Sequence, residues 1–117
     1  MKLNPDNLGL AAEKLATTFL IKHGLTLIAH NYHCRFGEID LIMQDAKTLV
    51  FIEVRLRKNS QFGGAGGSIT PKKMQKLILT AQHYLQTHGE QACRFDAILM
   101  DAVDATSIEW VRNAFDA

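Results

Sequence analysis

Hydrophobic positions along the 117-residue chain change their spacing several times, and each change predicts a different kind of element. Over residues 6–23 they recur every three or four positions, which is typical of an amphipathic helix. A second helical pattern begins with the capping residue Thr70 and with Pro71, and it stops at Gly89. The chain is therefore expected to contain two long helices that each bury one face.

Between and after these helices, shorter runs with strand-forming residues predict β-strands. The runs cover residues 25–29, 38–44, 49–57, 94–100 and 107–111. The resulting order is one helix, three strands, a second helix and two strands. This order predicts an α/β fold with a central mixed five-stranded sheet flanked by helices, built as one domain over residues 1–117.

The second and third predicted strands form a hairpin, and side chains alternate between its two faces. Ile39, Leu41 and Met43 fall on one face, which is apolar and is expected to enter the core. The opposite face carries several charged side chains, gathered at the end away from the turn. An apolar face and a charged face on the same hairpin predict that the charged end has a use other than packing.

Three acids, Glu38, Asp40 and Glu53, lie on the charged face of this hairpin. A two-residue turn sets Asp40 opposite Glu53, and Glu38 opposite Arg55. Like charges across a strand pair cost roughly 0.2–1 kcal/mol, so a positive group should offset them. A hard divalent cation held by Asp40, Glu53 and water is one candidate. A structural ion-pair cluster around Arg55 is the other, and the spacing does not choose between them.

The formal net charge of +1 conceals a basic segment. Between Val54 and Gly89 the chain has no acid, and the rest carries seven basic residues against all 12 acids, a balance of −5. The six basic residues of this segment are Arg55, Arg57, Lys58, Lys72, Lys73 and Lys76. Such an asymmetry favours a polyanionic partner on one face, although a solvated surface has the same composition.

Two of these lysines, Lys72 and Lys73, fall in the first turn of the second helix. There they oppose the helix dipole, at a cost of roughly 0.3–1 kcal/mol each when exposed. A phosphate bound at the helix N-terminus would explain their position, as would a purely solubilising role. The glycine-rich residues 58–69 before this helix form either a plain connector or a flap over a ligand.

The N-terminal residues lack the apolar run of a signal peptide, and no stretch approaches 18 consecutive apolar residues. These observations predict a cytoplasmic protein with no membrane partner. The basic segment described above favours a polyanion, such as a nucleic acid, as the partner.

Two stretches resemble the signature of the YraN-type bacterial protein family: Gly-Glu-Ile-Asp-Leu-Ile at 37–42 and Leu-Val-Phe-Ile-Glu-Val-Arg at 49–55. Thr-Pro-Lys-Lys at 70–73 and Arg-Phe-Asp at 94–96 extend the resemblance over most of the chain. That family resembles the restriction-endonuclease-like nucleases with the PD-(D/E)xK core, especially the Holliday-junction resolvases. The resemblance implies a restriction-endonuclease-like fold and a metal-dependent nuclease site.

In the nuclease pattern, a helical glutamate, an aspartate and a glutamate bind magnesium, and a lysine two places after the last acid assists the attacking water. Carried onto this sequence, the pattern implies Glu13, Asp40, Glu53 and Arg55 as catalytic residues, with Mg²⁺ or Mn²⁺ on Asp40 and Glu53. Arg55 departs from the usual lysine, and arginine keeps its charge at any working pH. His33 also departs, because relatives commonly carry arginine there.

The resemblance and the basic segment together predict a nucleic-acid partner, namely DNA. The expected contacts come from Arg55, Arg57, Lys58, Lys72, Lys73 and Lys76. Analogy with the resolvases adds a possible homodimer. Two functions follow: a magnesium-dependent nuclease on structured or branched DNA, or a DNA-binding or interaction module that keeps the nuclease fold without turnover.

Overall fold

The computed structural model describes residues 5–57 and 69–117, and its elements follow the predicted order. They are α1 (Pro5–Lys22), β1 (Thr26–Cys34), β2 (Gly37–Asp45), β3 (Thr48–Leu56), α2 (Pro71–His88), β4 (Cys93–Met100), the 3-10 helix η2 (Ala105–Ser107) and β5 (Glu109–Phe115). The strands form one sheet in the order β1-β2-β3-β4-β5, parallel only between β3 and β4. The predicted α/β fold is confirmed, and it is consistent with a restriction-endonuclease-like arrangement.

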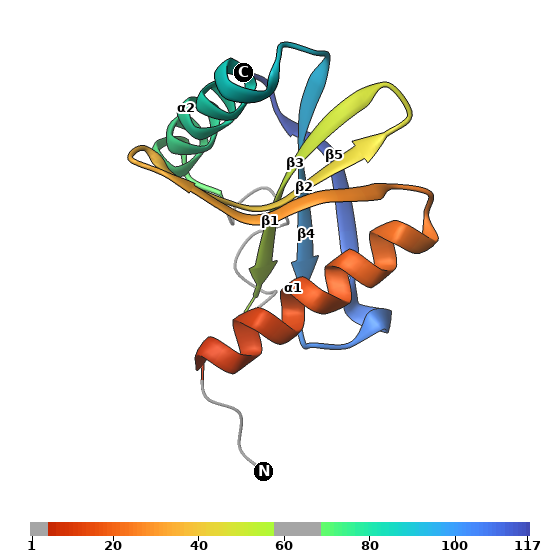
Figure 1. Cartoon of the computed structure of the whole chain (residues 1–117). Helices are drawn as coiled ribbons and strands as arrows, with labels where there is room; N and C mark the ends of the chain where they lie inside the picture. Colours follow the sequence, from red (N-terminus) through yellow and green to blue (C-terminus); the bar gives the residue numbers. More distant parts are fainter. Residues whose placement is uncertain (1–4, 58–68) are drawn as a thin grey trace.

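The two helices cover opposite faces of the sheet, so the protein has a core on each side (Figure 1). On one side α1 buries Ala12, Ala16 and Leu20 against strand residues that include Val50. On the other side α2 packs against strand residues such as Phe51. Each fully buried Leu, Ile or Phe contributes roughly 1.5–3 kcal/mol, so both faces stabilise the sheet. Within residues 5–57 and 69–117, neither helix is long and apolar enough to cross a membrane.

The β1–β2 pair changes face halfway along its length. Ile39 packs in the α2 core whereas Leu41 packs in the α1 core, so the prediction that they share one face is wrong. Asn31 on β1, between the partners of Leu41 and Ile39, has a left-handed backbone with φ of 51°. Short polar side chains such as asparagine tolerate that conformation. The slip places Asp40 at the point where the alternation of the strand is interrupted.

The predicted boundaries differ from the structure mainly in β1 and in β5, which ends at Phe115 and not at residue 111. β1 continues to Cys34 instead of ending at Ala29, because its second half is a polar, partly exposed edge strand that pairs with β2. Hydrophobic alternation is weak in such a strand. β5 begins at Glu109, because Ser107 belongs to η2, where its hydroxyl donates to the Ala102 carbonyl at 2.7 Å.

The buried acid Asp96 on β4 links this strand to β5 directly and to β2 through Arg94. Asp96 is 1% exposed and accepts hydrogen bonds from Arg94 Nε at 3.0 Å, Trp110 Nε1 at 2.9 Å and the Asn113 backbone N at 3.0 Å. Arg94 in turn donates to Asp45 on β2 at 2.9 Å. The network fixes β5 against β4 by side-chain contacts and satisfies the buried charge.

Replacing Asp96 with alanine should lower the free energy of unfolding by about 3 kcal/mol or more, because a buried ion pair would lose one partner. Urea denaturation measures this loss. Asp101→Ala is the control, since Asp101 is an exposed partner of Arg57 and should cost under about 1 kcal/mol. Equal losses in the two variants would contradict the structural role assigned to Asp96.

Candidate active site

The β2–β3 hairpin opens at the end that carries the acids. Paired residues follow the predicted register from Asp45↔Thr48 as far as Leu41↔Ile52. Beyond that point, Asp40 Oδ2 accepts a hydrogen bond from the Val54 backbone N at 2.8 Å. A side-chain carboxylate therefore replaces the backbone carbonyl that a continuing strand would provide. The two strands separate there without leaving this buried N–H unpaired.

The expected pairing of Glu38 with Arg55 is wrong, because the ladder does not reach these residues. Glu38 instead pairs with His33 across the β1–β2 hairpin, with Oε2 at 3.3 Å from Nδ1. Both side chains are largely exposed, so this contact contributes little to stability. Glu38 lies on the outer β1 side of the hairpin opening.

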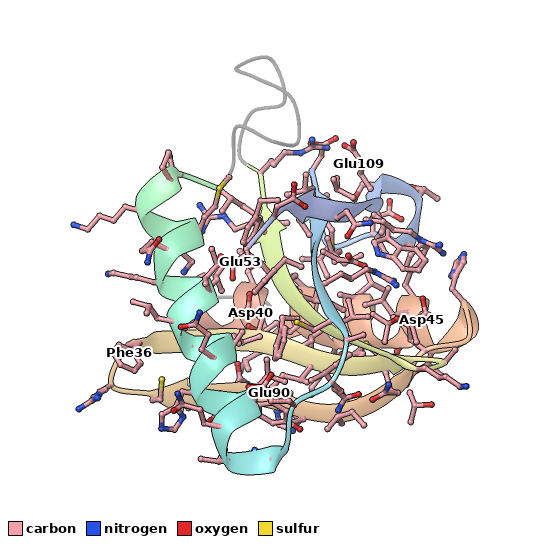
Figure 2. All side chains as sticks on the ribbon, turned by 90° about the horizontal axis from the view of Figure 1, so that it is seen from above. Phe36, Asp40, Asp45, Glu53, Glu90 and Glu109 are labelled. Carbon is pink, nitrogen blue, oxygen red and sulfur yellow. The ribbon has the colours of Figure 1, made fainter. Side chains whose placement is uncertain are left out.

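Glu53 is the buried member of the acid cluster, with 4% of its side chain exposed. Burial and then the neighbouring Asp40, with which it shares a hydrogen bond, raise the pKa of Glu53 to about 7. Figure 2 shows the two labelled side chains next to each other beside α2. Asp40 and Glu53 are therefore close neighbours, although the backbone pairing of the two strands ends one residue before them.

Two basic side chains approach Glu53 from different elements. Arg55 Nη1 lies 3.5 Å from Glu53 Oε2, and Lys73 Nζ lies 3.4 Å from the same oxygen. Arg55 comes from β3 itself, whereas Lys73 comes from the first turn of α2. Thr70 fixes that turn, because its hydroxyl accepts a hydrogen bond from the Lys73 backbone N at 3.1 Å. Both cations oppose the rise in the pKa of Glu53.

The start of β2 also approaches α2 closely, through a glycine. Gly37 has φ of 150°, and a Cβ atom there would lie 3.4 Å from the Thr80 hydroxyl oxygen. A larger residue at this position would strain the backbone and crowd α2. The glycine that opens the Gly-Glu-Ile-Asp motif thus lets β2 lie near the helix that carries Lys73.

Glu13 is a third acid, contributed by α1 from the other face of the sheet. Partial burial and then the charge of Asp40 raise the pKa of Glu13, while a hydrogen bond with the Asn31 side chain opposes the rise. Asp40 is therefore an electrostatic neighbour of both Glu13 and Glu53. Ile39 and Leu41, the chain neighbours of Asp40, pack in different cores, so Asp40 lies where the two faces of the sheet meet.

The remaining basic residues of the predicted DNA surface have different surroundings. Lys72 and Lys76 are exposed on α2. Arg57 is only 14% exposed and pairs with Asp101 at 3.1 Å and Glu109 at 3.2 Å, so its charge is already balanced by two acids. Lys58 lies outside the described residues.

Sequence reasoning assigned Lys73 to phosphate binding and did not foresee its contact with Glu53. It also gave no role to Asn31, which bonds Glu13. The available signals were a lysine placed against the helix dipole and an asparagine in the middle of a strand-like run. Neither signal identifies a partner that lies on a different element.

The donor set of the site suits a divalent cation with an incomplete protein shell. Across residues 5–57 and 69–117, no group of three or more His, Cys, Asp or Glu side chains is arranged to hold a metal ion. Mg²⁺ commonly uses only one or two carboxylates and keeps several waters. Asp40 and Glu53 supply two neighbouring carboxylates, and a bound cation would displace the proton that the raised pKa keeps on Glu53.

A mixed five-stranded sheet between two helices, with two neighbouring acids where a hairpin opens, defines the class as an α/β domain of restriction-endonuclease-like arrangement. The chain belongs to the uncharacterised protein family UPF0102, whose model matches residues 12–100. The matched region contains Glu13, Asp40, Glu53 and Arg55. The YraN-type membership that the motifs predicted is therefore confirmed.

Similar UPF0102 proteins occur in several bacteria. One from Methylobacillus flagellatus is 59% identical, over 94% of this chain and 97% of the relative. One from Nitrosospira multiformis is 54% identical over 92% of each chain. A third, from Psychromonas ingrahamii, is 57% identical over 92% of this chain and 88% of its own length. The likeness thus extends over nearly the whole of each chain.

The raised pKa of Glu53 makes stability depend on pH in a defined direction. The folded state keeps a proton up to a pKa of about 7, whereas the unfolded chain loses it near the ordinary value of 4.5. The free energy of unfolding therefore falls as pH rises between these values and stays lowered above them. Glu53→Gln should remove this cost and stabilise the protein at pH 8 by roughly 1–3 kcal/mol, with little change near pH 4.5.

Urea denaturation at several pH values measures this effect. Glu38→Gln is the matched control, because Glu38 is an exposed acid on the same hairpin and should change stability little at either pH. A Glu53→Gln protein that is less stable at pH 8 would mean that the contacts with Arg55 and Lys73 outweigh the cost of burial.

Proposed function

We propose that this protein is a metal-dependent nuclease that acts on structured or branched DNA. The observation that carries the proposal is Glu53, a buried acid that neighbours Asp40 and contacts both Lys73 and Arg55. Acidic side chains that can hold a divalent cation thus lie beside basic side chains that can hold a phosphate. Phosphodiester hydrolysis needs both kinds of group.

Asp40 and Glu53 would hold Mg²⁺ or Mn²⁺, and Glu13 supports the pair from the other face through the field of Asp40. Such a cation supplies charge stabilisation and a more acidic bound water. Glu53 must be ionised before it can hold the cation. For that reason we expect metal affinity to strengthen as pH rises through about 7.

Lys73 supplies the ammonium group that the nuclease pattern places where this chain has Arg55. Its Nζ lies as near to Glu53 as the Arg55 guanidinium does, at 3.4 Å against 3.5 Å. When a phosphate enters, both side chains exchange part of their contact with Glu53 for the phosphate oxygens. Arg55 keeps a fixed charge and a planar fork of donors, which suits phosphate orientation.

Lys72 and Lys76 extend the positive surface along the first turns of α2. Their contacts would reach the DNA backbone and would be independent of sequence but sensitive to salt. Nothing in the arrangement of these lysines indicates that they recognise the edges of the bases. The shape of the DNA, as at a branch or a flap, is therefore the expected basis of selectivity.

A panel of linear, flapped and four-way DNA, with Mg²⁺ or Mn²⁺ and with chelator, tests the proposal by cleavage and by gel shift. We expect cleavage that requires metal and DNA binding that persists in chelator. Asp40→Asn should abolish a saturable, metal-dependent rise in melting temperature and reduce cleavage by at least about 100-fold. Cleavage that survives both chelator and Asp40→Asn would refute the proposal.

Adjacent lysines provide a second test of the same site. Lys73→Ala should lower kcat by roughly 10- to 1000-fold, because an ammonium group next to the reacting phosphate is lost. Lys72→Ala should instead weaken DNA binding modestly, lower the salt dependence by about one phosphate contact and leave kcat unchanged. Single-turnover cleavage separates the two effects. Equal effects on binding and none on kcat would assign both lysines to simple phosphate contact.

One observation favours a second candidate function, a DNA-binding module without turnover. Arg55 stands where the nuclease pattern has lysine, and it already pairs with Glu53. An arginine that keeps this acid neutralised would leave the metal site closed. Arg55→Lys distinguishes the two functions: a gain of cleavage indicates a degenerate site, whereas a loss of cleavage indicates that arginine takes part in the reaction.

A further inference from the structure

A groove of about 440 Å³ runs between α1 and β1, on the α1 face of the sheet. Leu10, Leu27 and Leu41 form its apolar walls, and Leu10 and Leu27 remain 52% and 36% exposed. Exposed leucines at a groove are costly in water unless something covers them. The volume falls within the range of small-molecule sites in proteins, roughly 300–1,000 Å³.

The groove also has polar lining residues, and one of them lies opposite Asp40. Glu13, His30 and Asn31 line the groove, with His30 Nδ1 at 3.5 Å from the Asn31 amide nitrogen. Asn31 lies on β1 between His30 and Tyr32, which pair with Leu41 and Ile39, so it stands opposite Asp40 on β2. An occupant of the groove that reached Asn31 would therefore lie close to Asp40.

Resting on the proposed function, we propose that the groove receives one unpaired nucleobase of the DNA strand that is bound at the acid cluster. A nucleobase has two apolar faces and a polar edge, which match the leucine walls and the Asn31–Glu13 end. Enzymes that take a base out of the stack hold it in this way, with apolar contacts on its faces and hydrogen bonds at its edge.

The chemistry of the groove favours a base over a second copy of this chain. An aliphatic side chain from another protein molecule would cover Leu10 and Leu27 but would leave the polar edge at Asn31 without a new partner. A base reaches that edge with donors and acceptors of its own. The occupant also has to be continuous with a phosphate backbone, and a nucleotide meets both conditions.

Methyl NMR on the full chain provides the first test, with deoxynucleoside monophosphates as probes and chelator present to prevent reaction. The methyl signals of Leu10 and Leu27 should shift in a saturable way. Those of Ile21 and Ile28, which are 51% and 46% exposed but do not line the groove, should not shift. Shifts that follow the concentration of protein instead of nucleotide would identify a self-association surface and overturn the inference.

Two matched variants of α1 give the second test, by fluorescence anisotropy in chelator. Leu10→Gln should weaken binding of a single-stranded or flapped oligonucleotide about tenfold and should leave fully paired duplex unaffected. Ile21→Gln alters a residue of equal exposure outside the groove and should change neither. An abasic oligonucleotide that binds wild-type protein as tightly as the intact strand would overturn the inference, as would equal losses in the two variants.

These results also separate the inference from the proposed function. If the protein cleaves DNA in a metal-dependent way but its binding of DNA does not depend on a base, the nuclease proposal stands and the base pocket is refuted. Nucleotide-induced shifts at Leu10 and Leu27 without cleavage of any DNA in the panel support the pocket and count against the nuclease.

Discussion

The geometry of the candidate site depends on one hydrogen bond, from the Val54 backbone N–H to the Asp40 carboxylate. β2 leaves β3 at this point, and a buried N–H whose partner strand has departed costs roughly 1–3 kcal/mol if it stays unpaired. Asp40 supplies the missing acceptor from its side chain, so the strands can separate and Glu53 can occupy the junction. One carboxylate thus has both a structural and a chemical role, which is why its charge and its hydrogen-bonding capacity need to be varied separately.

The free protein balances the charge of its acids with its own basic groups. Arg55 and Lys73 both contact Glu53, and the raised pKa of Glu53 reduces the repulsion with Asp40 further. A divalent cation would compete with these basic side chains, whereas a phosphate would give them another anion to bind. If the proposed function holds, a cation and a phosphate would each favour binding of the other at this site.

Local patterns predicted most of the fold, and contacts between distant residues account for what they missed. Helical and strand periodicity gave the element order, and the short turn gave the hairpin register as far as Leu41. The left-handed backbone at Asn31 and the packing of Ile39 in the α2 core leave no periodic signal. The contact of Lys73 with Glu53, and the pairing of Arg57 with acids of the C-terminal strands, are likewise set by packing across elements.

Asp40 acts electrostatically on acids from both sides of the sheet. Its charge raises the pKa of Glu13 on α1 and the pKa of Glu53 on β3. A ligand that neutralises Asp40 would therefore make both glutamates give up their protons more readily. A sheet usually separates the charges on its two faces, whereas here one carboxylate lies close enough to act on both.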